Sequence, residues 1–196
     1  MKPAIALFEY DSIAAGIAAG DAMVKRAPLD GIYAGTVQPG RYLVIVGGSV
    51  GAVEEACLEA REAPNAEPAQ TVFLPNIDRR IIDRLCGGEA FSGPVESLGI
   101  LETRRAPAAL EAADAGLKGA SVELLEIRLS DGIGGKAYVL LAGVHSAVEA
   151  AIEIAADRIG AQALVGTKLI PQLHPEMLAN LRGESRFGRR LREHQA

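Results

Sequence analysis

The sequence predicts an α+β protein of two tandem ferredoxin-like domains, each with the order β-α-β-β-α-β and its helices on one side of an antiparallel sheet. Two observations predict this fold. Residues 5–32 recur within residues 98–127 at a constant offset of 93 positions, so that Lys118 falls on Lys25. In each copy, short apolar β-rich runs alternate with amphipathic helical patterns. A repeat this long indicates a duplicated domain, because solenoid units have only about 20 to 50 residues.

The repeat continues to the last strand of each copy. Residues 147–149 repeat 52–54 at an offset of 95, and Ile170-Pro171 falls on Leu74-Pro75 at an offset of 96. The first increase, of two residues, falls within one loop. We therefore expect a first domain with a short terminal helix, a second domain, and a basic C-terminal tail, at residues 1–88, 94–175 and 176–196.

The first copy shows clear boundaries between its elements. Asp11 or Ser12 is a good N-cap for the first helix, and Pro28 prevents that helix from continuing. Val37-Gln38-Pro39-Gly40 is typical of a hairpin turn. The expected elements are a strand, a helix, two hairpin strands, a second helix, a last strand and a short polar helix, at residues 3–9, 13–25, 29–36, 41–46, 50–60, 71–74 and 77–85. Pro64 to Pro68 breaks the second helix, and residues 87–94 form the linker between the copies.

The second copy follows the same order more clearly. Its hairpin turn is the longer, glycine-rich segment from Ser130 to Gly135, and Gly160 is well placed to end its second helix. The expected strands lie at residues 95–103, 122–129, 137–141 and 163–170, with the buried helix faces marked by residues 110–117 and 148–159.

Composition excludes several classes of protein. The net charge of −5 gives no general attraction to phosphate backbones, so we expect no nucleic-acid partner. Cys57 and Cys86 form no paired framework, which favours reduced thiols in the cytosol, and Cys57 lies on the apolar stripe of a helix as a small core residue. The start of the chain does not fit a signal peptide, and no apolar run approaches the roughly 20 residues of a membrane span. We expect a cytoplasmic protein with no membrane contact.

Two glycine-rich segments suggest phosphate binding only superficially. Residues 131–136 lack the glycine and the Ser or Thr that a P-loop places around its Gly-Lys pair, and they lie between two strands. Gly47-Gly48-Ser49 does open a helix, but its counterpart at residues 143–146 has lost the glycine cluster. A tight strand-to-helix turn is the preferred interpretation.

No arrangement of residues indicates catalysis or a metal site. His145, His174 and His194 have no Cys or His at ligand spacing. Glu9 and Glu102, at matched strand ends, are expected to serve structure. We therefore predict a protein that is not an enzyme and has no cofactor or metal. Two alternatives remain open: a small-ligand-binding regulatory protein of ferredoxin-like fold, and an enzyme subunit whose site lies between chains.

The duplicated unit resembles the shell proteins of bacterial microcompartments. The residues that carry the resemblance are LGILETR, EAADAGLK, SVELLEIR, the glycine-rich loop, AVEAAIEIAADRIGA and LIPQLHP in the second copy, with ALFE, AAGDAMVKRA, LDGIYAG, VGAVEEA and VFLPN in the first. Two complete domains in one chain are similar to the tandem class of this family, called BMC-T. The motifs are more specific in the second copy than in the first.

The resemblance implies a structural function. In the tandem class three chains form a pseudohexameric tile, a ring of six domains with a central pore for metabolites, and tiles join edge to edge in a shell around enzymes. The expected pore-lining residues are those of the two hairpin turns: Val37, Gln38, Pro39 and Gly40, and Ser130, Asp131, Gly132, Ile133, Gly134 and Gly135. The charge of Asp131, with Lys136 and Arg41 at the base, would set the potential of the pore.

The resemblance also implies contacts at the tile edge. Lys25 and Lys118 match the edge lysine of the family, although a lysine at a helix end is also favoured by the helix dipole. Asn76 and Gln172 stand where the family often has arginine, which favours tiling with a different, single-domain shell protein. The implied partners are two further copies of the chain, other shell proteins that form hexamers and pentamers, and encapsulated enzymes.

Some tandem shell proteins hold an iron–sulfur cluster on a cysteine of the pore loop. Neither loop of this chain contains Cys, so we expect no cluster. We also expect a single layer of trimers rather than two stacked ones, and a solvated basic tail.

Overall fold

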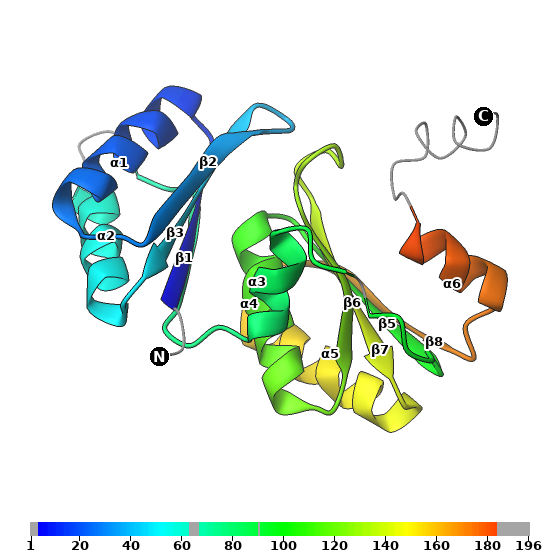
Figure 1. Ribbon diagram of the computed structural model, residues 1–196. Coiled ribbons are helices and arrows are strands. Elements are labelled where there is room, and N and C mark those ends of the chain that lie inside the picture. The colour runs from blue at the N-terminus through cyan, green and yellow to red at the C-terminus, as the bar shows by residue number, and fades with distance from the viewer. Residues whose placement is uncertain (1–3, 63–66, 90, 184–196) are drawn as a thin grey trace.

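Two antiparallel sheets lie side by side with helices between them in a computed structural model that describes residues 4–62, 67–89 and 91–183 (Figure 1). The first domain has strands β1 (Ala4–Tyr10), β2 (Gly31–Val37), β3 (Arg41–Gly48) and β4 (Gln70–Leu74), and helices α1 (Ile13–Arg26), α2 (Val50–Glu62) and α3 (Arg79–Leu85). The second has strands β5 (Ser97–Thr103), β6 (Glu123–Leu129), β7 (Ala137–Gly143) and β8 (Leu164–Pro171), and helices α4 (Ala106–Gly119), α5 (His145–Ile159) and α6 (Pro175–Arg182).

The strand orders are β2-β3-β1-β4 and β6-β7-β5-β8, which confirms the predicted ferredoxin-like arrangement twice. Most element boundaries fall within three residues of the predicted ones. Of the two predicted N-caps, Asp11 and Ser12, it is Ser12 that caps α1, its Oγ accepting a hydrogen bond from Ala15 N at 3.3 Å. Residue 3, most of the predicted helix break at 64–68 and the end of the tail lie outside the described residues. Helix α6 was not predicted.

The two faces of the first sheet have different neighbours. Alternate residues of β1, namely Ala4, Ala6, Phe8 and Tyr10, pack against α1 and α2 in one apolar cluster. Helix α1 comes close to the sheet at Gly16, where an added Cβ would lie 2.6 Å from Cδ1 of Tyr42. The residues between them in β1, Ile5 and Leu7, point to the opposite face and belong to a second cluster.

This second cluster joins the two domains. Ile5, Leu7 and Leu43 of the first sheet pack in it with α4, whose Leu110 is fully buried. Helix α3 lies beside α4 between the two sheets (Figure 1). The expectation of a polar helix is wrong for its inner side, because Ile81 is 0 % exposed. The domains therefore share one core, as small domains with little apolar interior require.

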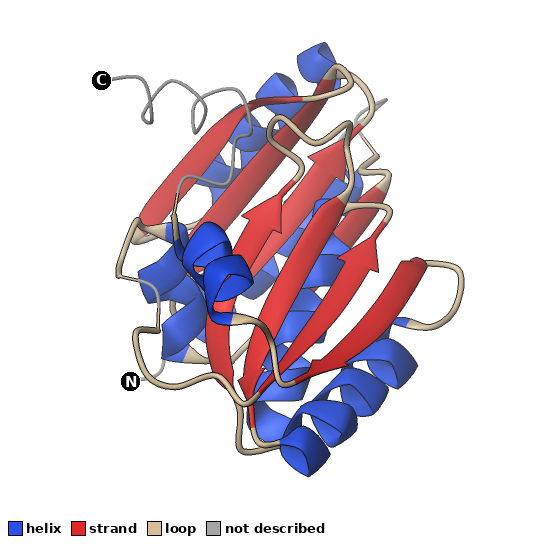
Figure 2. Cartoon of the chain, turned by 90° about the vertical axis from the view of Figure 1, so that its right-hand side faces the viewer, coloured by secondary structure: helices blue, strands red, loops and turns tan. Residues whose placement is uncertain are grey.

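The outer face of the second sheet carries α6 (Figure 2). Leu98, Leu125, Leu140 and Leu173 form a cluster there, and Leu178 and Leu181 of the helix pack against it. Helix α6 follows β8 as α3 follows β4, 96 positions earlier. The last helix is thus the second copy of the helix that joins the domains. Within the described part of the chain, every helix is too short or too polar to span a bilayer.

Replacing Ile81 with Ala should lower the free energy of unfolding by about 2 to 4 kcal/mol, because the substitution leaves a cavity in a shared core that cannot collapse without moving both domains. Urea titration at fixed protein concentration measures the change. Arg79→Ala, on the exposed side of the same helix, should change stability by less than about 0.5 kcal/mol. Equal small losses for both variants would contradict the shared core.

Candidate functional site: two hairpin loops and the domain junction

The two hairpin turns lie next to each other at one end of the molecule, joining β2 to β3 and β6 to β7 (Figure 1). An added Cβ on Gly135 would lie 2.7 Å from Cδ of Pro39, and this glycine has φ +83°. The guanidinium of Arg41 donates to the carbonyl oxygen of Gly135 at 3.3 Å. Two segments 95 positions apart in the sequence therefore form one surface.

The second loop is closed at its base and exposed at its tip. Ser130 is buried, and its Oγ donates to the carbonyl oxygen of Gly135 at 3.2 Å. The Nε of Arg128 donates to the carbonyl oxygen of Asp131 at 3.1 Å. Asp131, Gly132 and Gly134 are exposed, as are Gln38, Pro39 and Gly40 of the first loop. In the single chain, Ser130 and Gly135 support the loop, and the other eight predicted pore residues lie wholly or partly at the surface.

Beneath the loops, Glu9 binds the two domains together. Its carboxylate is 0 % exposed and accepts from Arg41 at 2.8 Å, from Arg105 at 3.0 Å and from the backbone N–H of Ala106 at 2.8 Å. The last contact caps α4, which has no capping side chain of its own. A carboxylate from the first domain thus supplies the cap for the second, which gives Glu9 the structural role expected for it.

A second polar cluster closes the opposite end of this junction. The carboxylate of Asp114, which is buried, accepts from the backbone N–H of Asp78 at 2.8 Å and from Lys118 at 2.6 Å. Lys118 also donates to the carbonyl oxygen of Asn76. Two of the predicted edge residues, Lys118 and Asn76, therefore meet at the boundary between the domains.

The other two predicted edge residues stay apart in a single chain. Among the residues that the structure describes, Lys25 pairs only with Asp21 in its own helix, at 2.5 Å, and both side chains are largely exposed. Gln172 lies beyond the end of β8, on the far side of the second domain. Lys25 and Gln172 are the counterparts of Lys118 and Asn76 in the repeat. Within one chain, however, Lys25 and Gln172 lie at opposite ends of the molecule.

Arg80, which the sequence analysis did not single out, also crosses the junction. Its guanidinium donates to the carbonyl oxygens of Val122 and Leu117 at 2.7 and 3.3 Å, and to Asp78. This side-chain hydrogen bond from Arg80 holds the pKa of the Asp78 carboxyl below its usual range. An arginine in a helix next to a domain boundary was the available signal, but its partners across the junction, Leu117 and Val122, lie 37 and 42 positions away and have no local pattern.

Gly47 and Gly48 end β3, and α2 begins two residues later, so the strand-to-helix turn is as tight as the sequence favoured. Ser49 Oγ accepts from Ala52 N at 3.2 Å at the start of α2, and an added Cβ on Gly48 would lie 3.3 Å from the backbone nitrogen of Asp30. Among the described residues, no group of three His, Cys, Asp or Glu side chains is placed to hold a metal ion.

The model of the BMC domain matches the chain twice, over residues 4–77 and 97–173. The chain belongs to the BMC-domain family. Its two BMC domains in tandem place it in the BMC-T class, as the sequence predicted. The matched ranges end where α3 and α6 begin.

Relatives of this BMC-domain protein match it over most of their length. The bacterial microcompartment shell protein PduT of Citrobacter freundii is 34% identical over 178 residues, which cover 90% of this chain and 96% of that protein. The crystal structure of a microcompartment protein from Desulfitobacterium hafniense DCB has a TM-score of 0.78 and 32% identity, covering 90% and 98% of the two chains. A fused permuted hexameric shell protein of the RMM microcompartment shares the fold, with a TM-score of 0.57 at 21% identity over 80% of this chain and 83% of its own.

Replacing Glu9 with Gln should destabilise the protein by about 3 kcal/mol, because two guanidinium groups lose their buried partner and α4 loses its charged cap. Chemical denaturation at fixed protein concentration measures the loss. Glu55→Gln, an exposed change on α2, is the matched control and should have little effect. A loss of less than about 1 kcal/mol for Glu9→Gln would contradict the role of Glu9 as a link between the domains.

The Asp78–Arg80 pair should make the junction sensitive to acid. Because the pKa of Asp78 is lowered in the folded state, its contribution to stability is fully present above the unfolded pKa of about 3.9 and is lost as the pH falls through the lower folded value. Asp78→Asn should therefore be destabilising at neutral pH, and its stability difference from the wild type should shrink below about pH 4. A stability difference between Asp78→Asn and the wild type that does not depend on pH would exclude this pair as the source of acid sensitivity.

Proposed function

We propose that three chains close into a ring of six domains that forms a pseudohexameric tile of a bacterial microcompartment shell. The protein is a structural component of such a shell, as its family membership and its full-length similarity to shell proteins support. Its role is therefore structural rather than enzymatic, and its place in the cell is the microcompartment shell. The ring is supported by one observation about the two domain surfaces.

The apolar residues buried at the domain junction have exposed counterparts at the two ends of the chain. On α4, Leu110 is 0 % exposed, whereas its counterpart on α1, Ile17, is 54 % exposed. On α3, Ile81 is 0 % exposed, whereas its counterpart on α6, Met177, is 49 % exposed. Surfaces of this kind are interaction sites in soluble proteins.

These two exposed surfaces are complementary to each other. At the junction, the first sheet and α3 cover α4, so by repetition the second sheet and α6 of one chain would cover α1 of the next. Lys25 would then reach the carbonyl oxygen of Gln172, and the Asp21 carboxylate would accept from the backbone N–H of His174, as Lys118 and Asp114 do within the chain. The predicted edge residues would thus meet in pairs at every corner of the tile.

Repeating one contact around an axis gives a closed ring when the rotation closes. Two domains per chain and a sixfold ring require three chains. The paired hairpin loops then surround the axis in alternation, because Gly135 already lies against Pro39 within one chain. Three copies of the exposed Asp131 would give the pore a negative rim, with Lys136, which lies 3.7 Å from Glu102, nearer its base.

The same residues suggest partners beyond the trimer. Asn76 and Gln172 lack the charge of arginine at the outer corners, so we propose that the tile joins single-domain shell hexamers and pentamers more readily than itself. Encapsulated enzymes would contact one of its two faces.

Ile17→Asp and Met177→Asp should each convert the trimer to monomers, since a carboxylate in either half of an apolar interface lacks a partner once buried. Light scattering should report three times the 20.5 kDa chain mass for the wild type and a single chain mass for both variants. Leu58→Asp is the matched control, because Leu58 is also 54 % exposed but lies on α2, away from both surfaces. A monomeric wild type, or equal masses for all four proteins, would contradict the proposal.

A further inference from the structure

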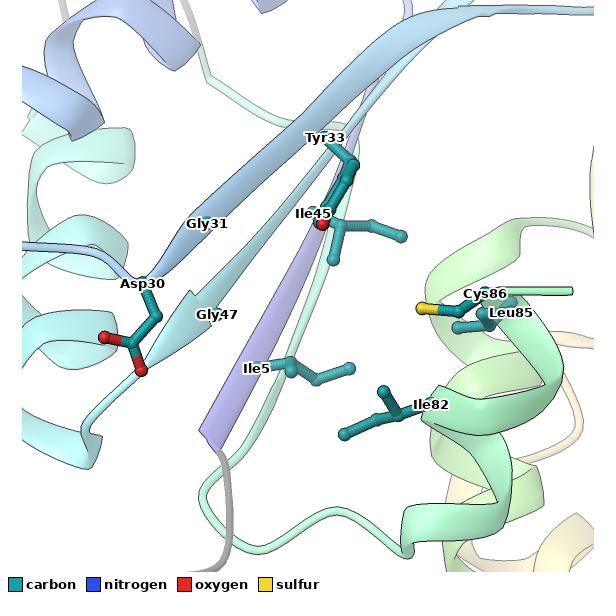
Figure 3. A pocket seen from close by; sticks show the side chains of 9 residues that line it. All are labelled: Ile5, Asp30, Gly31, Tyr33, Ile45, Gly47, Ile82, Leu85 and Cys86. Atoms are coloured by element: carbon teal, nitrogen blue, oxygen red, sulfur yellow. The ribbon is translucent and has the colours of Figure 1, made fainter. Parts of the chain in front are cut away.

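A pocket of about 450 Å³ opens on the face of the first sheet opposite α1 and α2, beside α3 (Figure 3). Ile5 and Ile45 form its floor, and Ile82 and Leu85 of α3 form one wall. Tyr33, at the rim, is 72 % exposed. The space exists because Gly31 and Gly47, which also line it, have no side chains. A mostly apolar hollow of this size, open to water, lacks an occupant within the described chain.

The matching place in the second domain is filled. Leu98, Leu140, Leu178 and Leu181 stand 93 to 96 positions after Ile5, Ile45, Ile82 and Leu85 and form the cluster beneath α6. Leu125, brought to this face beside a register shift in β6, fills part of the space. Val95, at the end of the linker between the domains, also packs there. The linker therefore supplies an apolar side chain at the position where the first domain has a pocket.

Contacts of Phe91 and Gly93 mark the path of the linker from α3 to this cluster. Phe91 lies in a depression with Arg80, Arg84 and Leu124, at the edge of the second sheet. Further along, the carbonyl oxygen of Gly93 accepts from Arg182 of α6. The linker thus leaves α3, crosses the edge of the neighbouring sheet and ends beside that sheet's own outer helix.

The C-terminal segment repeats this linker. Gly183, Phe187 and Leu191 stand 96 positions after Gly87, Phe91 and Val95, at the same offset that relates α6 to α3. The eight residues from 184 to 191 match the eight from 88 to 95 by which the chain passes from Gly87 to Val95. The segment is therefore long enough for the same course, and it carries its aromatic and aliphatic residues at the same places.

We infer that the C-terminal segment of each chain docks in trans, crossing the edge of β2 of the next chain and placing Leu191 in the pocket formed by Ile5, Ile45, Ile82 and Leu85. This inference rests on the proposed trimer, in which α6 of one chain meets the first domain of the next. In that position the segment would follow, on the first sheet of the next chain, the course that the linker follows on the second sheet of its own chain.

Charge favours the same occupant. The linker has Ala90, Gly93 and Pro94 where the tail has Arg186, Arg189 and Arg190. The acidic side chain on the rim of the pocket is Asp30, which is exposed.

The repeat also places residue 189 of the tail. Arg189 is the counterpart of Gly93, and Cys86 is the counterpart of Arg182, the residue that contacts Gly93. The tail of one chain should therefore bring residue 189 next to Cys86 of its neighbour.

Disulfide trapping tests this placement in the full-length protein. In Arg189→Cys, mild oxidation should join residue 189 of one chain to Cys86 of the next, because Cys86 is exposed while Cys57 is buried. Three such bonds close the ring, so a non-reducing gel should show covalent trimers, and Cys86→Ser should abolish them. Adding Leu191→Asp should slow trapping about tenfold or more, because the buried leucine anchors the segment. Leu191→Val, which restores the linker's residue, should retain fast trapping.

A fluorescence measurement avoids the engineered disulfide. Tyr33→Trp introduces a single tryptophan into a chain that has none. Its emission should shift to longer wavelength when Leu191→Asp removes the docked segment from the pocket rim.

The outcomes separate this inference from the proposed function. If light scattering gives a trimer but trapping occurs within one chain, or is insensitive to Leu191→Asp, docking in trans is overturned and the tile stands. Unchanged tryptophan emission after Leu191→Asp would also overturn it. If the wild type is a monomer, the proposed tile fails and the inference fails with it.

Discussion

The structure depends on the burial of α4 between two sheets. Its inner side belongs to the second domain, as in any ferredoxin-like unit, but its other side is covered by Ile5, Leu7 and Leu43 of the first domain. Glu9 caps the start of this helix, and the Asp114 and Lys118 cluster ties its end to the segment after β4. A helix held in this way from both sides fixes the angle between the domains. The same angle, applied again at the chain end, determines where the next chain would bind.

The contact between neighbouring chains is expected to have fewer polar links than the contact between the two domains of one chain. Glu176 stands where Arg80 donates to two backbone carbonyls and to Asp78, so this bridging cation is absent from α6. Ser12 replaces Arg105 at the start of α1 and already caps its own helix. Docking of the C-terminal segment would add contacts between chains, where the counterparts of Arg80 and Arg105 make no such links. The covalent linker inside each chain and the docked tail between chains would then both hold adjacent domains of the ring together.

Much of the fold could be predicted from the sequence, because the information is local or repeated. The apolar periodicity places the strands and helices, Ser12 and Pro28 set the limits of α1, and the duplication fixes the domain count. The pairing of the predicted edge residues Lys118 and Asn76 could not be predicted, since it depends on how one domain packs on the other. Ile81 and Arg80 were missed for the same reason: a seven-residue helix rich in charge has no periodic apolar stripe long enough to identify its buried side. Helix α6 was obscured by the basic composition of the residues that follow it.

One contact, repeated, would build both the chain and the tile. The most direct measurement is an experimental structure of the assembled particle, in which the pair of domains across the chain junction is superposed on the pair within one chain. We expect α1 to lie under the second sheet and α6 of the neighbour, with Lys25 donating to the carbonyl oxygen of Gln172 and the hairpin loops around a central pore. An assembly in which α1 faces solvent, or in which chains meet through a twofold axis, would contradict it.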